Sequence, residues 1–99
     1  MEVTAWSNGQ STYGVRVGTH SRAQYFAGRP ERIEVSIDGQ NHEFELTSGF
    51  WKKCPEFRDA GGTAIRDWLN QHHTTSWPKG QPPRFELYAL GGDRFRLGD

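Results

Sequence analysis

The sequence has little cysteine and no long hydrophobic run. The one cysteine, Cys54, excludes an internal disulfide and a zinc site built from several cysteines, and it fits a reducing compartment. No apolar stretch approaches the roughly 20 residues that cross a bilayer, and the first residues show neither a basic start nor an apolar export segment. We therefore expect a cytoplasmic protein that does not enter a membrane.

Branched aliphatic residues and net charge are also scarce. Val, Ile and Leu together number 12, whereas Phe, Trp and Tyr number 13, so aromatic side chains must form much of the core. Twelve Lys and Arg balance twelve Asp and Glu, and this balance disfavours disorder despite the low aliphatic content. A chain of 99 residues has the size of one domain, so we expect a single domain over residues 1–99.

Alternating apolar residues around turn dipeptides predict three β-hairpins. In the first, residues 3–7 lead into Asn8-Gly9, a pair typical of a tight two-residue turn, and then into a second extended stretch. The other two combine residues 32–37 with 42–46 around Asp38-Gly39, and residues 85–87 with 95–97 around the turn at 91–93. Residues 74–83 are rich in Pro, Gly and polar residues and predict a loop.

Helical signals are shorter. Residues 21–26 predict one helical turn capped by Ser21, with Tyr25 and Phe26 facing inward. Phe50, Cys54 and Phe57 occur at helical spacing, and Pro55 divides this segment into two short helices, with the Cys54 thiol buried on the apolar face.

The best helical pattern follows in residues 63–73. Thr63 is a suitable cap, and Ile65, Trp68, Leu69 and His72 form one apolar stripe that must pack on a sheet. Together these elements predict an α+β fold: about six antiparallel strands in three hairpins form an open sheet or a pseudobarrel, with one or two helices between the second and third hairpins.

Charge is unevenly distributed along the chain. Between Val3 and Pro30 there is no Asp or Glu, and the basic and amide side chains there are Asn8, Gln10, Arg16, His20, Arg22, Gln24 and Arg29. Arginine neutralises phosphate, and Arg, Asn and Gln each form paired hydrogen bonds with base edges, so this composition suits nucleic acid. An ordinary solvated hairpin is the alternative, because a pI near 6.9 does not meet the criterion for a basic domain.

A resemblance to a known family is carried by VRVGTHSRAQYF (residues 15–26) and RIEVSIDGQNHEFELTSGFW (residues 32–51). In the first segment, an early strand leads into a short helix that ends in an Ala-x-x-Phe-like motif. In the second, two strands are joined at an Asp-Gly-like turn, and a Leu-Thr pair precedes an aromatic-containing helix. These features resemble the plant DNA-binding pseudobarrel of the auxin-response-factor type, the "B-three" domain, and the related recognition domain of restriction endonucleases. The chain departs from that family at residues 18–20, where a basic residue beside proline is usual.

The resemblance implies a DNA-binding pseudobarrel with two arms that reach the DNA. These arms would fall near residues 8–22 and in the loop after residues 42–46, which carries Lys52 and Lys53. We therefore expect a non-catalytic module that binds nucleic acid, with duplex DNA as the partner, through the residues of the acid-free segment together with these two lysines. No cofactor or metal is expected.

Two other functions stay open. A protein- or small-ligand-binding domain would use Trp77, Lys79 and Tyr88, since prolines hold the loop extended and an exposed Trp offers a flat apolar face. Its partner would be a separate protein or a larger protein of which this domain is one part. A small hydrolase or nuclease would use His72, Glu56 and Asp59, but no motif supports it. The adjacent His72 and His73 point about 100° apart on a helix and do not chelate one ion.

Overall fold

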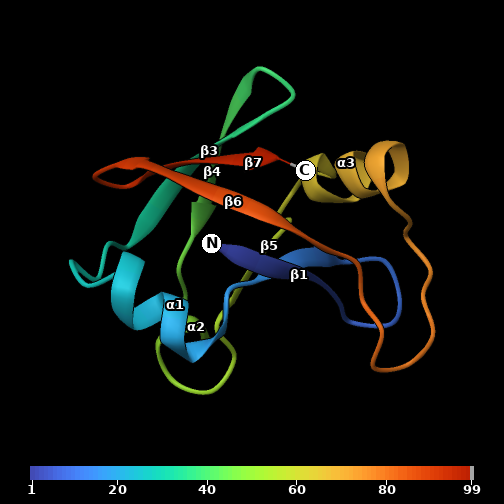
Figure 1. Ribbon diagram of the computed structural model, residues 1–99, viewed down its shortest axis with the longest axis horizontal. Coiled ribbons are helices and arrows are strands. Elements are labelled where there is room, and N and C mark those ends of the chain that lie inside the picture. The colour runs from blue at the N-terminus through green and yellow to red at the C-terminus, as the bar shows by residue number, and fades with distance from the viewer. Residues whose placement is uncertain (99) are drawn as a thin grey trace.

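Residues 1–98, which the computed structural model describes, form seven strands and three helices (Figure 1). In chain order the elements are β1 (Glu2–Ser7), β2 (Tyr13–Arg16), α1 (Gly18–Tyr25), β3 (Arg32–Ile37), β4 (Gln40–Glu45), α2 (Ser48–Trp51), β5 (Glu56–Arg58), α3 (Ala64–His72), β6 (Arg84–Gly91) and β7 (Arg94–Gly98). All strands belong to one sheet with the order β4-β3-β7-β6-β1-β2-β5. The α+β class is confirmed, and the expected strand number is one too low because β5 was not foreseen.

The sheet curls until its two edge strands, β4 and β5, approach each other. The rings of Phe44 on β4 and Phe57 on β5 meet with 5.1 Å between their centroids, so the sheet is nearly a closed barrel. Neighbouring strands are antiparallel except β3 and β7, which run parallel with Val35 opposite Phe95. The expectation of a purely antiparallel sheet is wrong at this pair. That expectation rested on the lack of a single crossover helix between successive strands, whereas here several elements together connect β3 to β7.

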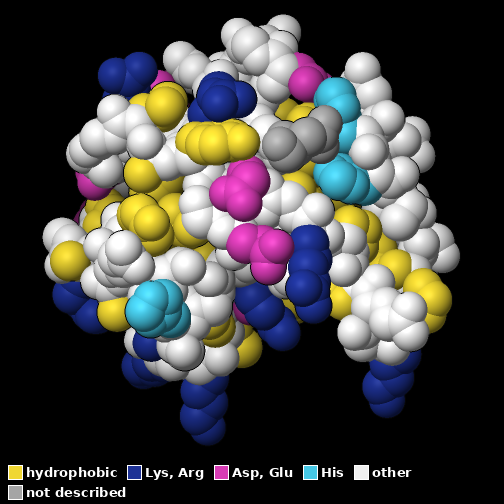
Figure 2. Space-filling model, in the orientation of Figure 1, with side chains coloured by type: hydrophobic (Ala, Val, Ile, Leu, Met, Phe, Trp, Pro, Cys, Tyr) yellow, Lys and Arg dark blue, Asp and Glu magenta, His cyan; other side chains and the backbone are white. Residues whose placement is uncertain are grey.

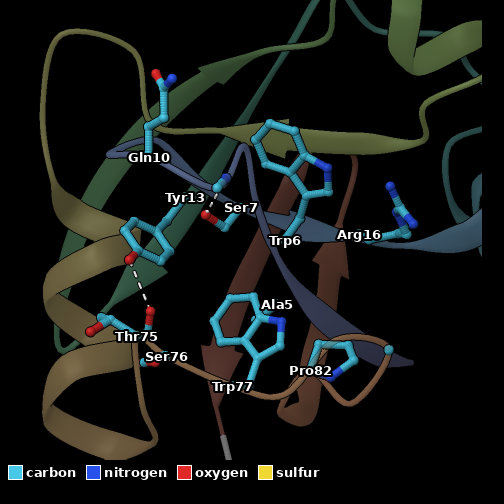
Figure 3. Close-up of a pocket in the computed structure, with 12 residues that line it drawn as sticks. Ala5, Trp6, Ser7, Gln10, Tyr13, Arg16, Thr75, Ser76, Trp77 and Pro82 are labelled. Atoms are coloured by element: carbon cyan, nitrogen blue, oxygen red, sulfur yellow. Dashed lines mark hydrogen bonds between the residues drawn. The ribbon is translucent and has the colours of Figure 1, made fainter.

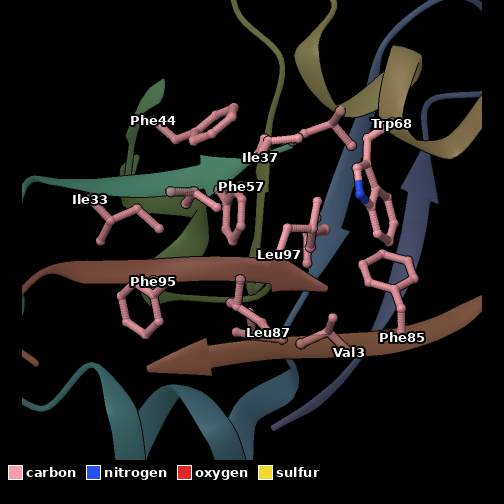
Figure 4. Packing of buried hydrophobic residues seen from close by; sticks show 14 of the residues in the cluster. Val3, Ile33, Ile37, Phe44, Phe57, Trp68, Phe85, Leu87, Phe95 and Leu97 are labelled. Atoms are coloured by element: carbon pink, nitrogen blue, oxygen red, sulfur yellow. The ribbon is translucent and has the colours of Figure 1, made fainter. Parts of the chain in front are cut away.

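Aromatic side chains fill the interior of the barrel. Every phenylalanine of the chain is buried: Phe26, Phe44, Phe50, Phe57, Phe85 and Phe95. Phe26 stacks on Phe95 at 4.9 Å between centroids and meets Phe50 edge-on at 5.2 Å. Figure 4 shows side chains of β3, β6 and β7 together with Trp68 of α3 entering one common interior. The prediction of an aromatic-rich core is therefore confirmed.

The first two hairpins end in different turns. Asp38 and Gly39 have φ values of 51° and 82°, so the predicted tight turn between β3 and β4 is confirmed. The tight turn predicted at Asn8-Gly9 is wrong, because β1 and β2 are joined by the longer segment 8–12. There the Asn8 side-chain oxygen accepts the amide protons of Gln10 and Thr12 at 2.9 and 3.1 Å and stabilises the wider turn.

Helix α1 begins earlier than the sequence indicated. It starts at Gly18, whose φ of +83° is readily adopted by glycine. The preceding residue, Val17, donates its amide proton to the carbonyl oxygen of Pro55. Phe26 is buried as expected, whereas Tyr25 is 38% exposed and the prediction that it faces inward is wrong. Among the helices of residues 1–98, none is both long and apolar enough to span a bilayer.

Residues 54–58 contradict the predicted second short helix. Residues 56–58 form β5, in which Phe57 lies opposite Val15 of β2 and points into the core. Helical spacing and strand alternation both place Phe57 inside, and pairing with β2 decides between them. Cys54 lies in the preceding turn and is exposed, so the predicted buried thiol is also wrong.

Helix α3 is confirmed, although its amino-terminal amides are bound by a different side chain. Ile65, Trp68 and Leu69 are buried against the sheet. The Thr63 hydroxyl donates to the Asp67 carboxylate at 2.9 Å and does not cap the backbone. The Asp59 carboxylate accepts the amide protons of Ile65 and of the next residue at 2.9 and 3.1 Å. Burial raises the pKa of Asp59, against the opposing effect of these two bonds.

Candidate nucleic-acid interface

One row of residues crosses β1, β2 and β5 on the outer face of the sheet. Trp6 lies opposite Gly14, and Gly14 lies opposite Arg58. Val3 and Ala5 occupy the buried positions of β1, so alternation turns Trp6 outward. Since Gly14 has no side chain, the Arg58 guanidinium reaches across it and lies 4.4 Å from the centre of the Trp6 ring.

Beside this row, two arginines share one buried carboxylate. The Glu56 side chain is 2% exposed, and its two oxygens lie 3.4 Å from Arg16 Nε and 3.5 Å from Arg58 Nη2. The arginine side chains are 50% and 46% exposed, so the pair presents a net charge of about +1 to solvent. Burial of the shared carboxylate holds both guanidinium groups on the outer face of the sheet.

Two segments distant in sequence meet at the end of β2 where α1 begins (Figure 1). Arg22 of α1 donates to the carbonyl oxygens of Phe50 and Lys52 at 2.7 and 3.4 Å. The Arg29 guanidinium lies 4.5 Å from the centre of the Trp51 ring. These contacts join α1 and Arg29 to the segment of residues 50–52. We name the basic residues of these segments the basic end: His20, Arg22, Arg29, Lys52 and Lys53.

The basic end carries no acidic side chain of its own. Neither residues 16–29 nor residues 50–55 contain Asp or Glu. Figure 2 shows Lys and Arg side chains along the lower margin of the molecule and also at its upper edge, with Asp and Glu side chains at its middle and upper parts. Two acids on neighbouring strands have basic partners: Glu2 lies 3.9 Å from Arg84, and Glu86 lies 3.3 Å from the terminal amine of Met1. Within the two segments of the basic end, the positive side chains therefore have no acidic neighbour in sequence.

A cavity of about 550 Å³ lies at the opposite end of β2, between the β1–β2 hairpin and the loop of residues 73–83. The Tyr13 hydroxyl donates to the carbonyl oxygen of Thr75 at 2.9 Å, and this bond fixes the loop over the hairpin. Trp77 is half-buried and meets the Tyr13 ring edge-on at 6.2 Å. Figure 3 shows Trp6, Tyr13 and Trp77 around this cavity, with Arg16 at one side.

The residues singled out from the sequence divide between these places. Gln10 and Arg16 line the cavity, and Asn8 stabilises the turn beside it. Gln24 is exposed on α1, and Lys79 is exposed in the loop that carries Trp77. Tyr88 lies on β6 and does not line the cavity. The Arg96 guanidinium lies over its ring, 4.3 Å from the ring centre.

Sequence reasoning missed Trp6 and Arg58. The signal for Trp6 was strand alternation: Trp6 lies two residues after Thr4, so both are on the polar side of the strand, opposite to Ala5. Arg58 had no such signal, because residues 56–58 were assigned to a helix. Its position depends on the register between β2 and β5.

The residues of the hydrolase alternative are engaged in separate contacts. Glu56 binds two arginines, Asp59 caps α3, and His72 Nε2 lies 3.0 Å from an Asp38 carboxylate oxygen. In the described part of the chain, no group of three or more His, Cys, Asp or Glu side chains is arranged to hold a metal ion. These contacts give the hydrolase alternative no support.

The fold and surface define an α+β domain with a barrel-like sheet, one basic end and one aromatic cavity. Comparisons of the chain with protein-family models, with curated proteins and with solved structures each found no match.

Proposed function

We propose that this chain is a non-catalytic module that binds duplex DNA through the outer face of β2 and β5 and the adjoining basic end. The observation that carries the proposal is the convergence of two acid-free segments, 16–29 and 50–55, through Arg22. A group of cations beside a strand suits the closely spaced phosphates of a duplex, which supply most of the affinity of such complexes.

The basic residues have separate roles in this proposal. His20, Arg29, Lys52 and Lys53 are exposed and contact phosphates, as does the Arg16 guanidinium. Arg22 mainly joins α1 to the α2 segment, because its guanidinium donates to two carbonyl oxygens. The exposed amides of Gln10 and Gln24 are the candidates for contact with base edges.

The resemblance to the plant pseudobarrel supports the same surface. Its two DNA-reaching arms correspond to residues 8–22 and to the segment that carries Lys52 and Lys53. In this structure β2 connects the two regions: Tyr13 adjoins the turn of residues 8–12, and Val17 is hydrogen-bonded to Pro55. The outer face of β2 thus lies between both proposed arms.

Fluorescence anisotropy with a labelled mixed-sequence duplex tests this proposal. If the surface neutralises about three to five phosphates, the affinity falls by about 40- to 500-fold between 50 and 200 mM salt. Arg16→Ala lowers the affinity, while Arg94→Ala, on β7, leaves it within about twofold. Absence of binding at 50 mM salt, or binding that salt does not weaken, refutes the proposal.

The cavity beside Trp77 favours a second candidate, the binding of a small ligand or a protein segment. Its volume lies within the range of small-molecule sites, and three aromatic rings line it. Binding of this kind buries apolar surface and persists at high salt. A ligand or partner whose affinity is the same at 50 and 200 mM salt would favour this candidate over DNA.

A further inference from the structure

The cavity at the far end of β2 combines flat aromatic faces with polar groups. Trp6, Tyr13 and Trp77 line it, and so do the Gln10 amide and the Ser7 hydroxyl (Figure 3). The Arg58 guanidinium occupies one face of the Trp6 ring, which leaves the other face for a ligand. Planar rings bind other planar rings by stacking, and an amide side chain forms two hydrogen bonds with a planar donor–acceptor edge.

Arg16 connects this cavity with the cationic surface. Its side chain lines the cavity and is also held by Glu56 beside Arg58. A ligand stacked within the cavity therefore has a cation at its margin. The ligand chemistry that matches this arrangement is a heterocyclic base attached to a phosphate.

We propose that the cavity binds one unpaired nucleobase of the DNA, stacked against Trp77 and Trp6, with the adjoining phosphate bound by Arg16. This inference rests on the proposed DNA-binding function and adds a site for a base that has left the duplex. The cavity volume of about 550 Å³ accommodates one nucleotide and matches the general range of ligand sites. The Gln10 amide is placed to bind the polar edge of the base.

The cost of extracting a base determines which DNA is preferred. Removing a paired base from a duplex costs a few kcal/mol, and the cost is least for a mismatched or unpaired base. Stacking of one base on an aromatic side chain is worth roughly 1–3 kcal/mol. The protein therefore binds a duplex with one unpaired base more tightly than the fully paired duplex, by about 5- to 150-fold.

The experiment compares two labelled duplexes that differ only by one bulged adenine. For the wild-type protein we expect the ratio of the two affinities to exceed about 5. Trp77→Ala brings this ratio to about 1, whereas Trp77→Phe, which keeps a ring, retains most of it. Tyr88→Ala is the matched control, because it removes an aromatic side chain outside the cavity, and its ratio equals that of the wild type.

The two proposals fail in different ways. If neither duplex binds, the DNA-binding function is refuted together with this site. If both duplexes bind with the expected salt dependence but with equal affinity, only the base site is refuted, and a peptide or small ligand becomes the candidate occupant of the cavity. If the preference exists but survives in Trp77→Ala, the base binds elsewhere and the assignment of the cavity is wrong. Thermal unfolding of each variant confirms that it is folded at the assay temperature.

Discussion

Lys52 and Lys53 provide a direct test of the basic end, because removing their side chains leaves the local fold intact. Both residues are exposed, and the contact that Arg22 makes here is with the backbone carbonyl of Lys52, which alanine retains. The double substitution Lys52→Ala/Lys53→Ala therefore removes two cations from the surface while Arg22 still joins α1 to the α2 segment.

The expected loss follows from the release of counterions. Each phosphate contact contributes a slope of about 0.9 to the dependence of log affinity on log salt concentration. Two lost contacts reduce the slope by about 1.8, and at 0.15 M salt they lower the affinity by about 5-fold each and about 30-fold together. This factor corresponds to about 2 kcal/mol of binding free energy.

Anisotropy titrations at several salt concentrations between 50 and 200 mM measure both the slope and the affinity. The control is Arg94→Ala/Arg96→Ala on β7, which removes the same charge from a strand separated from β2 by β6 and β1. The control slope should equal that of the wild type. Equal losses in the two double variants would show that only net charge matters, and an unchanged slope in the lysine variant would refute phosphate contact at this end.

Two further predictions concern the scaffold that supports the site. A Cβ atom at position 14 would clash with the backbone carbonyl oxygen of Phe57, so Gly14→Ala separates β2 from β5. We expect this variant to lower the free energy of unfolding, measured by urea titration, by about 1–3 kcal/mol. Gly28→Ala, at an open position, is the control and should change it little. Because its pKa is raised, the Asp59 carboxyl binds its proton more tightly in the folded protein than in the unfolded chain. The protonated carboxyl therefore stabilises the fold below pH 3.8, and this stabilisation is lost as the pH rises through the raised pKa. The unfolding free energy of the wild type relative to Asp59→Asn should therefore fall over this interval and become constant above it; an increase with pH would contradict the assigned cause.

Local patterns were sufficient for the β3–β4 hairpin and for the apolar face of α3. Ile33, Val35 and Ile37 alternate up to Asp38-Gly39, and both the strand and its turn depend on neighbours in sequence. The spacing of residues 65, 68 and 69 likewise places one apolar stripe on the sheet. These elements are specified by short stretches of chain, and they formed as predicted.

Residues 54–58 show where local patterns fail. Phe57 is apolar in both periodicities, and only its pairing with Val15, more than 40 residues earlier, makes this segment a strand. The parallel pairing of β3 with β7 depends on contacts of similar range. Such pairings depend on tertiary packing, which propensity does not encode.

The candidate site was foreseen in part. The acid-free segment drew attention to Arg16 and Arg22, and the structure places Lys52 beside Arg22. The sequence did not show that Asn8 and Gln10 lie at the other end of β2, because the longer turn carries them toward Trp77. Nor did it show that Glu56 binds the arginines, since that contact requires β2 and β5 to be adjacent.

Strand β7 is the last described element of the chain and yet occupies the middle of the sheet, between β3 and β6. Without β7, the sheet therefore consists of two separate parts. One is the β3–β4 hairpin, and the other is formed by the four strands β6, β1, β2 and β5. The sheet becomes continuous only when β7 pairs with both β3 and β6. Removal of residues 94–98 would leave two separate half-sheets, whose unpaired edges at β3 and β6 favour aggregation.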